Sequence, residues 1–158
     1  MSLKLNNKVI KMNIRNKGNV FTNKQIEKFL KLFDEDFRNL TFVFYESRID
    51  LLKYFMVNIF IIEALLGKLE GTYSVISNRI NVFIFAQTDD GEDIQSKQLY
   101  SFHALTHEIR HYIQAREGFA GNKEKDADEF ATKFIKRKSK QISKIMKWKD
   151  EWEVKEED

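Results

Sequence analysis

The order of apolar and polar residues along the chain predicts four short strands. They are expected over residues 8–15, 40–45, 72–77 and 79–86. Apolar and polar side chains alternate in the first of these, KVIKMNIR, and the second, LTFVFY, is a short apolar and aromatic run. Ser77 and Asn78 separate the last two strands, so we expect a hairpin there.

Apolar residues at helical spacing predict four helices. They are expected over residues 22–36, 48–68, 98–116 and 122–148. Thr22 and Gln25 form a capping-box pattern at the start of the first helix. Gly118 and Gly121 end the third helix and allow a tight reversal into the fourth. The second helix includes residues 57–62, VNIFII, which a strand would also explain, so this assignment stays open.

Strands and helices follow one another in an order typical of an α+β domain, in which helices cover one mixed sheet. The length of 158 residues suits one domain, expected over residues 1–150, followed by an acidic tail over residues 151–158. The most apolar stretch, residues 51–66, is too short for a membrane span and is interrupted by polar residues. We therefore expect a small single domain with a sheet of three or four strands and no membrane segment.

Composition narrows the chemistry that a functional site could use. The chain is 42% apolar and 32% charged, and its net charge of only +3 argues against a polyelectrolyte binder. It contains no cysteine, which excludes disulfide scaffolds, zinc fingers and thiol catalysis. A bound metal would need His, Asp or Glu ligands. The first residues contain no apolar run long enough for a signal peptide, so we expect a cytoplasmic protein.

A metal-binding pattern lies in the third predicted helix, where residues 107–111 read HEIRH and match H-E-x-x-H. Residues four apart share a helix face, so His107 and His111 present two imidazoles to one point, with Glu108 beside it. Two neutral ring nitrogens can hold Zn²⁺ while the glutamate takes a proton from a water that the metal activates. Two histidines on an ordinary helix surface would give the same short pattern, so a further ligand is needed.

The start of the fourth predicted helix supplies candidates for the rest of the site. Residues 124–128 read EKDAD, which matches E-x-x-A-D and places Glu124 and Asp128 on one helix face. If the last two helices pack antiparallel, Glu124 can reach a metal held by the two histidines. Asp128 would then accept a hydrogen bond from the far nitrogen of a ligating histidine and orient its ring. Ala127 is small enough to let the helices approach closely.

Together the two motifs resemble those of gluzincin metallopeptidases, and the chain is similar to minimal gluzincins and to ImmA/IrrE-type peptidases. The motif match covers residues 104–131, whereas the N-terminal half agrees only in the order of its elements. The resemblance implies a zincin-like fold with an active-site helix and a glutamate-bearing C-terminal helix. The roles that it implies are zinc binding by His107, His111 and Glu124, general-base catalysis by Glu108 and ligand orientation by Asp128.

An enzyme of this kind hydrolyses a peptide bond of a peptide or protein substrate with a zinc-activated water, and the small size favours a narrow substrate. The oxyanion needs an additional hydrogen-bond donor. The candidates are Tyr73, Tyr100, His103 and Arg110. The resemblance also implies that the substrate pairs with an edge strand. We expect residues 79–86 to be that strand, because they precede an acidic loop and then the active-site helix.

Arg110 departs from the family pattern, which usually has uncharged residues in the middle of H-E-x-x-H. It points about 100° away from His111, so we expect it to pair with a carboxylate or with substrate at the rim of the cleft. Two other residues could serve as the third metal ligand, but both are weaker candidates than Glu124. Glu117 would need the glycine of the metzincin motif where the chain has Gln114. His103 lies about 12 Å from His111 along the helix axis, too far to share one ion easily.

Residues 133–149, KFIKRKSKQISKIMKWK, are densely basic with apolar residues interleaved. They would suit a surface for nucleic acid or anionic lipid, but the solvated outer face of a helix that packs on the domain is the favoured interpretation. The alternative to a peptidase is a non-catalytic, zinc-containing regulatory or binding module that contacts DNA or a partner through this helix. Nothing in the sequence indicates an oligomeric state.

Overall fold

A four-stranded mixed sheet lies at the centre of the fold. The computed structural model describes residues 12–52, 63–87 and 93–149. The strands are β1 (Asn13–Asn16), β2 (Thr41–Tyr45), β3 (Gly71–Ser74) and β4 (Arg79–Phe83), in the spatial order β1-β2-β4-β3. β2 pairs in parallel with both β1 and β4, whereas β3 pairs antiparallel with β4 and forms one edge.

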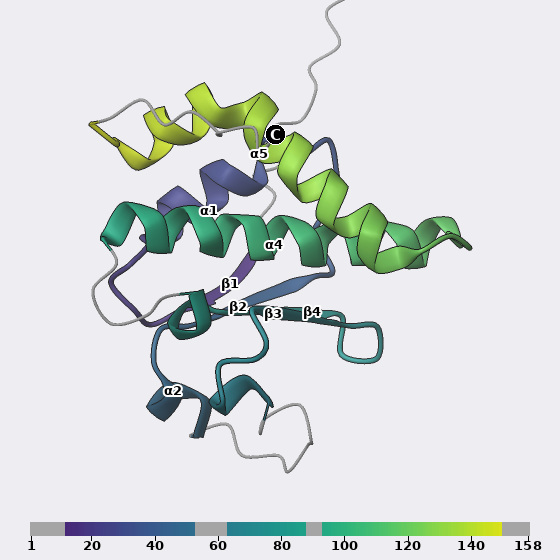
Figure 1. The fold of residues 1–158 in the computed structure, drawn as a ribbon, viewed down its shortest axis with the longest axis horizontal. Helices are drawn as coiled ribbons and strands as arrows, with labels where there is room; N and C mark the ends of the chain where they lie inside the picture. The colour runs from purple at the N-terminus through teal and green to yellow at the C-terminus, as the bar shows by residue number, and fades with distance from the viewer. Residues whose placement is uncertain (1–11, 53–62, 88–92, 150–158) are drawn as a thin grey trace, which may run out of the picture.

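Helices lie on both sides of the sheet. They are α1 (Asn23–Leu30), α2 (Arg48–Leu52), α4 (Ile94–Glu117) and α5 (Lys123–Met146), with a 3₁₀ helix, η1 (Ile84–Gln87), after β4. Figure 1 shows α4 along one side of the sheet with α1 and α5 beyond it, and α2 on the opposite side. Within the described ranges, no helix is long and apolar enough to cross a membrane.

Phenylalanine rings fill the core between the sheet and helices α1, α4 and α5. Phe29 of α1 and Phe102 of α4 stack with their ring centroids 3.9 Å apart, and Phe33 stacks on Phe134 of α5 at 4.0 Å. Such rings bury large apolar areas and pack with defined geometry. These contacts tie α4 and α5, the two helices that carry the sequence motifs, to α1 and to each other through a shared core.

The α+β class and the single mixed sheet are confirmed, as is the hairpin formed by β3 and β4. The first helix ends at Leu30 rather than near Asp36. The N–H groups of Leu32 and Phe33 donate to carbonyls three residues earlier, a tighter bonding pattern that ends the α-helix. α4 begins at Ile94, before the expected residue 98, because Asp93 caps it.

The strand that we expected to pair with substrate is not an edge strand. β4 is paired with β2 on one side and with β3 on the other. It ends at Phe83, where η1 begins, rather than at residue 86. Strand order depends on pairing between segments that are far apart in the chain, which local sequence patterns do not report. β3 is the edge strand that packs beside α4.

Four segments lie outside the described ranges: residues 1–11, 53–62, 88–92 and 150–158. They include the first part of the strand expected over 8–15, much of the helix expected over 48–68, half of the acidic loop, and the acidic tail. The predictions for those segments stay predictions.

Candidate metal centre

His107 and His111 of α4 and Glu124 of α5 converge on one point. The two histidine Nε2 atoms are 3.0 Å apart, and each lies 3.3 Å from an oxygen of the Glu124 carboxylate. Among the described residues, these three form a group that could hold a metal ion, with ligand atoms within 4.8 Å of one another. Ligands that share a tetrahedral zinc at ordinary bond lengths lie about 3.3 Å apart, so this donor set fits zinc.

Antiparallel packing of α4 on α5 produces this convergence. α4 ends at Gly118, whose φ of 66° is the left-handed conformation that favours glycine, and Asn122 caps the start of α5. Each step of one turn toward the start of α4 is matched by a step of one turn toward the end of α5, and each step brings one pair of side chains into contact. They pair His111 with Glu124, His107 with Asp128 and His103 with Thr132. Ala127 and Ala131 are fully buried, and their small side chains allow the close approach that these contacts require.

Asp128 orients the ring of His107. Its Oδ1 atom lies 2.8 Å from His107 Nδ1. When the Nδ1 hydrogen is donated to this carboxylate, the lone pair of Nε2 is directed at the point where the ligand atoms meet. This is the contact that the spacing of Glu124 and Asp128 led us to expect.

Gln114 orients the ring of His111, and sequence analysis did not identify this role. Gln114 Oε1 lies 2.9 Å from His111 Nδ1. The amide nitrogen donates to the carbonyl of Lys123 at 2.9 Å and to Asp126 Oδ2 at 2.8 Å. Because a carbonyl and a carboxylate can only accept, they determine which way the amide faces, and Oε1 is left to receive the His111 Nδ1 hydrogen. The Nε2 lone pair of His111 is thereby also available to a cation.

Arg110 meets Asp126 between α4 and α5, and neither residue lines the cleft. Its Nε atom donates to Asp126 Oδ2 at 2.6 Å, and its guanidinium stands over the rings of Phe119 and Phe130, with centroids 5.8 and 5.4 Å away. The hydrogen bond from Arg110 lowers the pKa of Asp126 below its usual range. Arg110 therefore pairs with a carboxylate, as expected. It does not line the cleft, so it is not placed to donate to an oxyanion there.

Glu108 is buried next to the convergence point, with only 8% of its surface exposed. Burial, and after it the charge of Glu124, raises the pKa of Glu108 to about 8. The backbone N–H of Tyr73 donates to the Glu108 carboxylate and opposes this rise in pKa. Gly71 makes room for the same side chain, because a Cβ atom there would come within 2.9 Å of Glu108 Cγ. A cation at the nearby ligand atoms would favour the ionised carboxylate.

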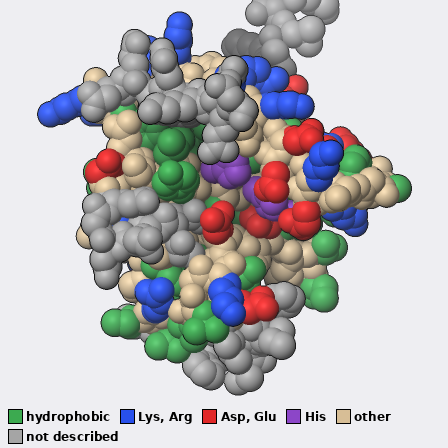
Figure 2. Space-filling model, viewed as in Figure 1, with side chains coloured by type: hydrophobic (Ala, Val, Ile, Leu, Met, Phe, Trp, Pro, Cys, Tyr) green, Lys and Arg blue, Asp and Glu red, His purple; other side chains and the backbone are tan. Residues whose placement is uncertain are grey.

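The convergent side chains open onto a cleft of about 960 Å³ that follows β3. Figure 2 shows histidine and acidic side chains gathered at one place on this face of the molecule. The N–H of Phe83 donates to the carbonyl of Glu70, which means that Glu70 turns its backbone toward β4. The alternate residues Gly71 and Tyr73 therefore turn their backbone groups toward the open edge of the sheet.

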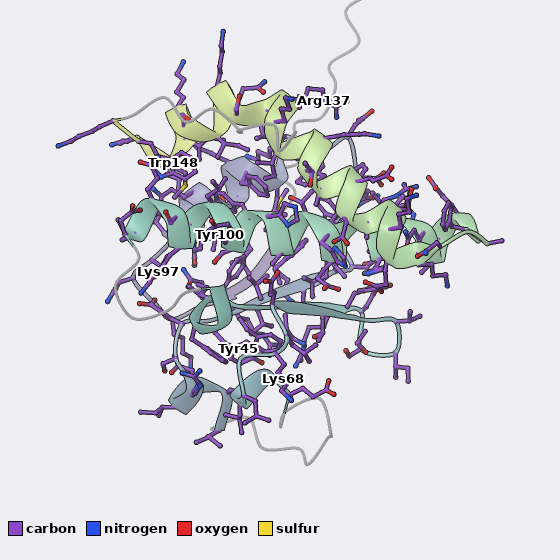
Figure 3. The ribbon with its side chains drawn as sticks, viewed as in Figure 1. Tyr45, Lys68, Lys97, Tyr100, Arg137 and Trp148 are labelled. Carbon is purple, nitrogen blue, oxygen red and sulfur yellow. The ribbon has the colours of Figure 1, made fainter. Side chains whose placement is uncertain are left out.

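The remaining candidates from the sequence differ in how they relate to the cleft. His103 lines it and contacts Thr132 Oγ1 at 3.2 Å, and burial lowers the pKa of His103. Tyr73 also lines it, with its ring edge-on to Tyr112 at 5.8 Å. Tyr100 lies on α4 (Figure 3), is 49% exposed and does not line the cleft. Of the four oxyanion candidates, only His103 and Tyr73 therefore lie at the cleft.

Two contributors to the site were not found from the sequence. Gln114 stands three residues after His111, a spacing that places both on one helix face, and this was the signal available. Gly71 gave no local signal, because its contact with Glu108 joins segments that are far apart in the chain.

No family model, curated protein or solved structure matches the chain. The resemblance to gluzincin metallopeptidases therefore rests on the two motifs and on the arrangement of the residues within them.

Proposed function

We propose that the protein is a zinc-dependent metallopeptidase of gluzincin type. The observation that carries this proposal is the convergence of His107, His111 and Glu124 beside the buried carboxyl of Glu108. A structural zinc site usually has four protein ligands and has no use for a buried base next to them. Three ligands that leave one position open, with a base at hand, are typical of a catalytic zinc site.

The three ligands would hold zinc, and zinc in that position lowers the pKa of a water molecule and polarises the carbonyl of a bound peptide. Asp128 and Gln114 keep the two imidazoles in the orientation that binding needs. The Glu124 side chain is 75% exposed, so its ligand atoms can be reached from solvent.

Glu108 would carry the proton during hydrolysis. Its carboxylate takes a proton from the attacking water and then gives it to the nitrogen of the leaving amine, which departs as a neutral group. The Tyr73 backbone N–H holds the carboxylate in place for both transfers. Burial raises the pKa of Glu108 in the metal-free chain, and a cation held by the three ligands would favour the ionised carboxylate that a general base needs.

The substrate would bind as an extended segment beside β3. Gly71 and the carbonyl of Tyr73 face the open edge, and an added strand can pair with such groups. The Tyr73 N–H is already engaged by the Glu108 carboxylate. This assigns to β3 the role that we expected of residues 79–86. A protein substrate would have to present a flexible segment to this edge, which agrees with a narrow substrate range.

The test compares wild-type protein with Glu108→Gln and Glu124→Ala. We expect about one zinc per chain in the wild type and in Glu108→Gln, and clearly less in Glu124→Ala. Hydrolysis of a peptide library should be abolished by chelator and reduced about 10²- to 10⁴-fold in Glu108→Gln. Glu117→Gln, an exposed change on the same helix, is the matched control and should keep its activity.

The outcomes separate the proposal from its alternative. Full activity of Glu108→Gln would reject the general-base role, and wild-type protein that binds no zinc would reject the metal centre. Zinc at full occupancy without hydrolysis of any library or protein substrate would favour a non-catalytic zinc-containing module.

A further inference from the structure

The positive charge of the chain is concentrated in one segment of α5 and the residues after it. Residues 133–149 contain eight Lys and Arg and no acidic residue, against a net charge of +3 for the whole chain. The remainder of the chain is therefore net negative. The N-terminal part of α5 contains the acidic residues at the metal centre, so one helix carries charges of opposite sign at its two ends. A charge asymmetry this strong is typical of a surface that contacts a polyanion.

Helical geometry gathers these cations on one side of α5. Five of them share a stripe about 100° wide and about 16 Å long. They are Lys133, Lys136, Arg137, Lys140 and Lys144, which we term the cationic stripe, and all five are exposed. Figure 3 shows Arg137 on the side of α5 that faces away from the sheet. Every turn of the helix from Lys133 to Lys144 contributes at least one cation, so the stripe is a continuous row of positive charge.

The opposite side of α5 holds the stripe in a constant orientation. Phe134, Ile135, Ile142 and Met146 are buried in the main core. Just after the helix, the indole N–H of Trp148 donates to Gln98 Oε1 at 2.8 Å, which ties the end of α5 to α4. The helix therefore cannot turn its apolar face outward without losing core packing.

We propose that the cationic stripe binds the phosphate backbone of double-stranded DNA without sequence preference. A rigid row of Lys and Arg is suited to phosphate contacts, which carry most of the affinity in non-specific binding. Binding of single strands usually adds exposed aromatic rings for base stacking. The two aromatic residues of 133–149 are committed to the fold, because Phe134 is buried and the half-buried Trp148 packs on the core and donates to Gln98. Insertion into a membrane surface requires an exposed apolar face, and the apolar face of α5 is used by the core.

The experiment measures binding of the full-length chain to duplex DNA of random sequence, about 20 base pairs long, between about 50 and 200 mM salt. The test variant combines Arg137→Gln, Lys140→Gln and Lys144→Gln. The matched control combines Lys24→Gln, Lys28→Gln and Lys31→Gln, which removes the same charge from exposed positions on α1 and at its C-cap. Thermal unfolding of both variants establishes that each is folded.

The wild type should bind with a steep dependence on salt. In the stripe variant, Kd at the lowest salt should rise at least about tenfold, and the slope of log K against log salt should fall by about 2 to 3. The control should stay close to the wild type. Equal weakening of both variants would overturn the assignment to the stripe, and so would wild-type protein that does not bind at low salt.

Two further arms identify other occupants of the stripe. Binding to phosphatidylserine vesicles in preference to DNA would replace the proposal with a membrane surface. Residues 150–158 contain six acidic residues directly after the stripe segment. A variant in which Glu151, Glu153, Glu156 and Glu157 are changed to Gln tests this segment. If only that variant binds DNA, the acidic segment and not DNA is the occupant of the stripe in the unaltered chain.

Discussion

Arg110 of α4 and Asp126 of α5 form a 2.6 Å hydrogen-bonded ion pair outside the cleft. The same Asp126 oxygen accepts from Gln114, whose amide oxygen in turn faces Nδ1 of His111. The charged residue in the middle of H-E-x-x-H is therefore the outer end of a chain of contacts that leads to a candidate metal ligand. Arg110 and Gln114 are positioning residues in this arrangement, because neither supplies a ligand atom.

Replacing Gln114 should weaken metal binding without removing a ligand. Gln114→Leu deletes the acceptor of the His111 Nδ1 hydrogen, so we expect zinc affinity to fall by about 10- to 100-fold. Gln98→Leu is the matched control. Gln98 is also a buried glutamine of α4 with hydrogen bonds, to Val20 and Trp148, but it lies away from the ligand atoms. Competition titration with a chelator measures both affinities. Equal losses of zinc affinity in the two variants would mean that Gln114 affects metal binding only through the stability of the fold.

Asp128 should act on metal binding through His107. Asp128→Ala removes the acceptor 2.8 Å from Nδ1 and should lower zinc affinity by about 10-fold or more. Asp128→Asn keeps an oxygen that can accept the same hydrogen, so it should restore part of the loss. Glu129→Ala, the next residue on the same helix, should leave zinc affinity unchanged. If Asp128→Asn and Asp128→Ala lose the same zinc affinity, the hydrogen bond to His107 is not the cause of the loss.

Glu108 should make the stability of the metal-free protein depend on pH. Its folded-state pKa of about 8 lies above the ordinary value of 4.5, so the folded protein holds a proton that the unfolded chain releases between these values. Protonation of Glu108 therefore favours the folded state at high pH less than at low pH. Its contribution to the free energy of unfolding is complete below pH 4.5 and is lost as pH rises toward 8.

Glu108→Gln removes this dependence. Relative to the wild type, the variant should gain stability between pH 5 and pH 8, on the order of a few kcal/mol. Urea unfolding in the presence of chelator measures the difference. Glu27→Gln, an exposed change on α1, serves as the control. A stability difference between wild type and Glu108→Gln that is constant over this pH range would contradict the raised pKa.

Gly71→Ala should disturb the general base more than the metal. The added Cβ would meet Glu108 Cγ at 2.9 Å and the carbonyl oxygen of Asn81 at 3.1 Å. We expect a loss of about 1–3 kcal/mol of stability and a fall in hydrolysis, with zinc stoichiometry retained. Gly118→Ala is the control for strain alone. An added Cβ at Gly118 meets no atom within 4 Å, so the variant is strained only through the positive φ of this residue in the α4–α5 turn. Unchanged hydrolysis by Gly71→Ala would show that Glu108 tolerates the displacement.

The sequence by itself determined the parts of the site that depend on short-range geometry. The four-residue spacings put His107 beside His111 and Glu124 one turn from Asp128 because the helical repeat is 3.6 residues. The glycine turn between the helices is short, so antiparallel packing brings the two pairs together. The α+β class followed from the order of apolar patterns for the same reason, since each pattern reports its own local structure.

Only the tertiary structure decided which groups from distant segments meet. It placed β3 rather than β4 at the edge of the sheet, because strand order is set by pairing across long stretches of chain. It buried Glu108 beside Gly71, and this burial raises the pKa of the carboxyl, while the backbone N–H of Tyr73 opposes the rise. It also gave Arg110 a partner in Asp126 on the next helix. These features arise from packing, and spacing along one helix does not contain that information.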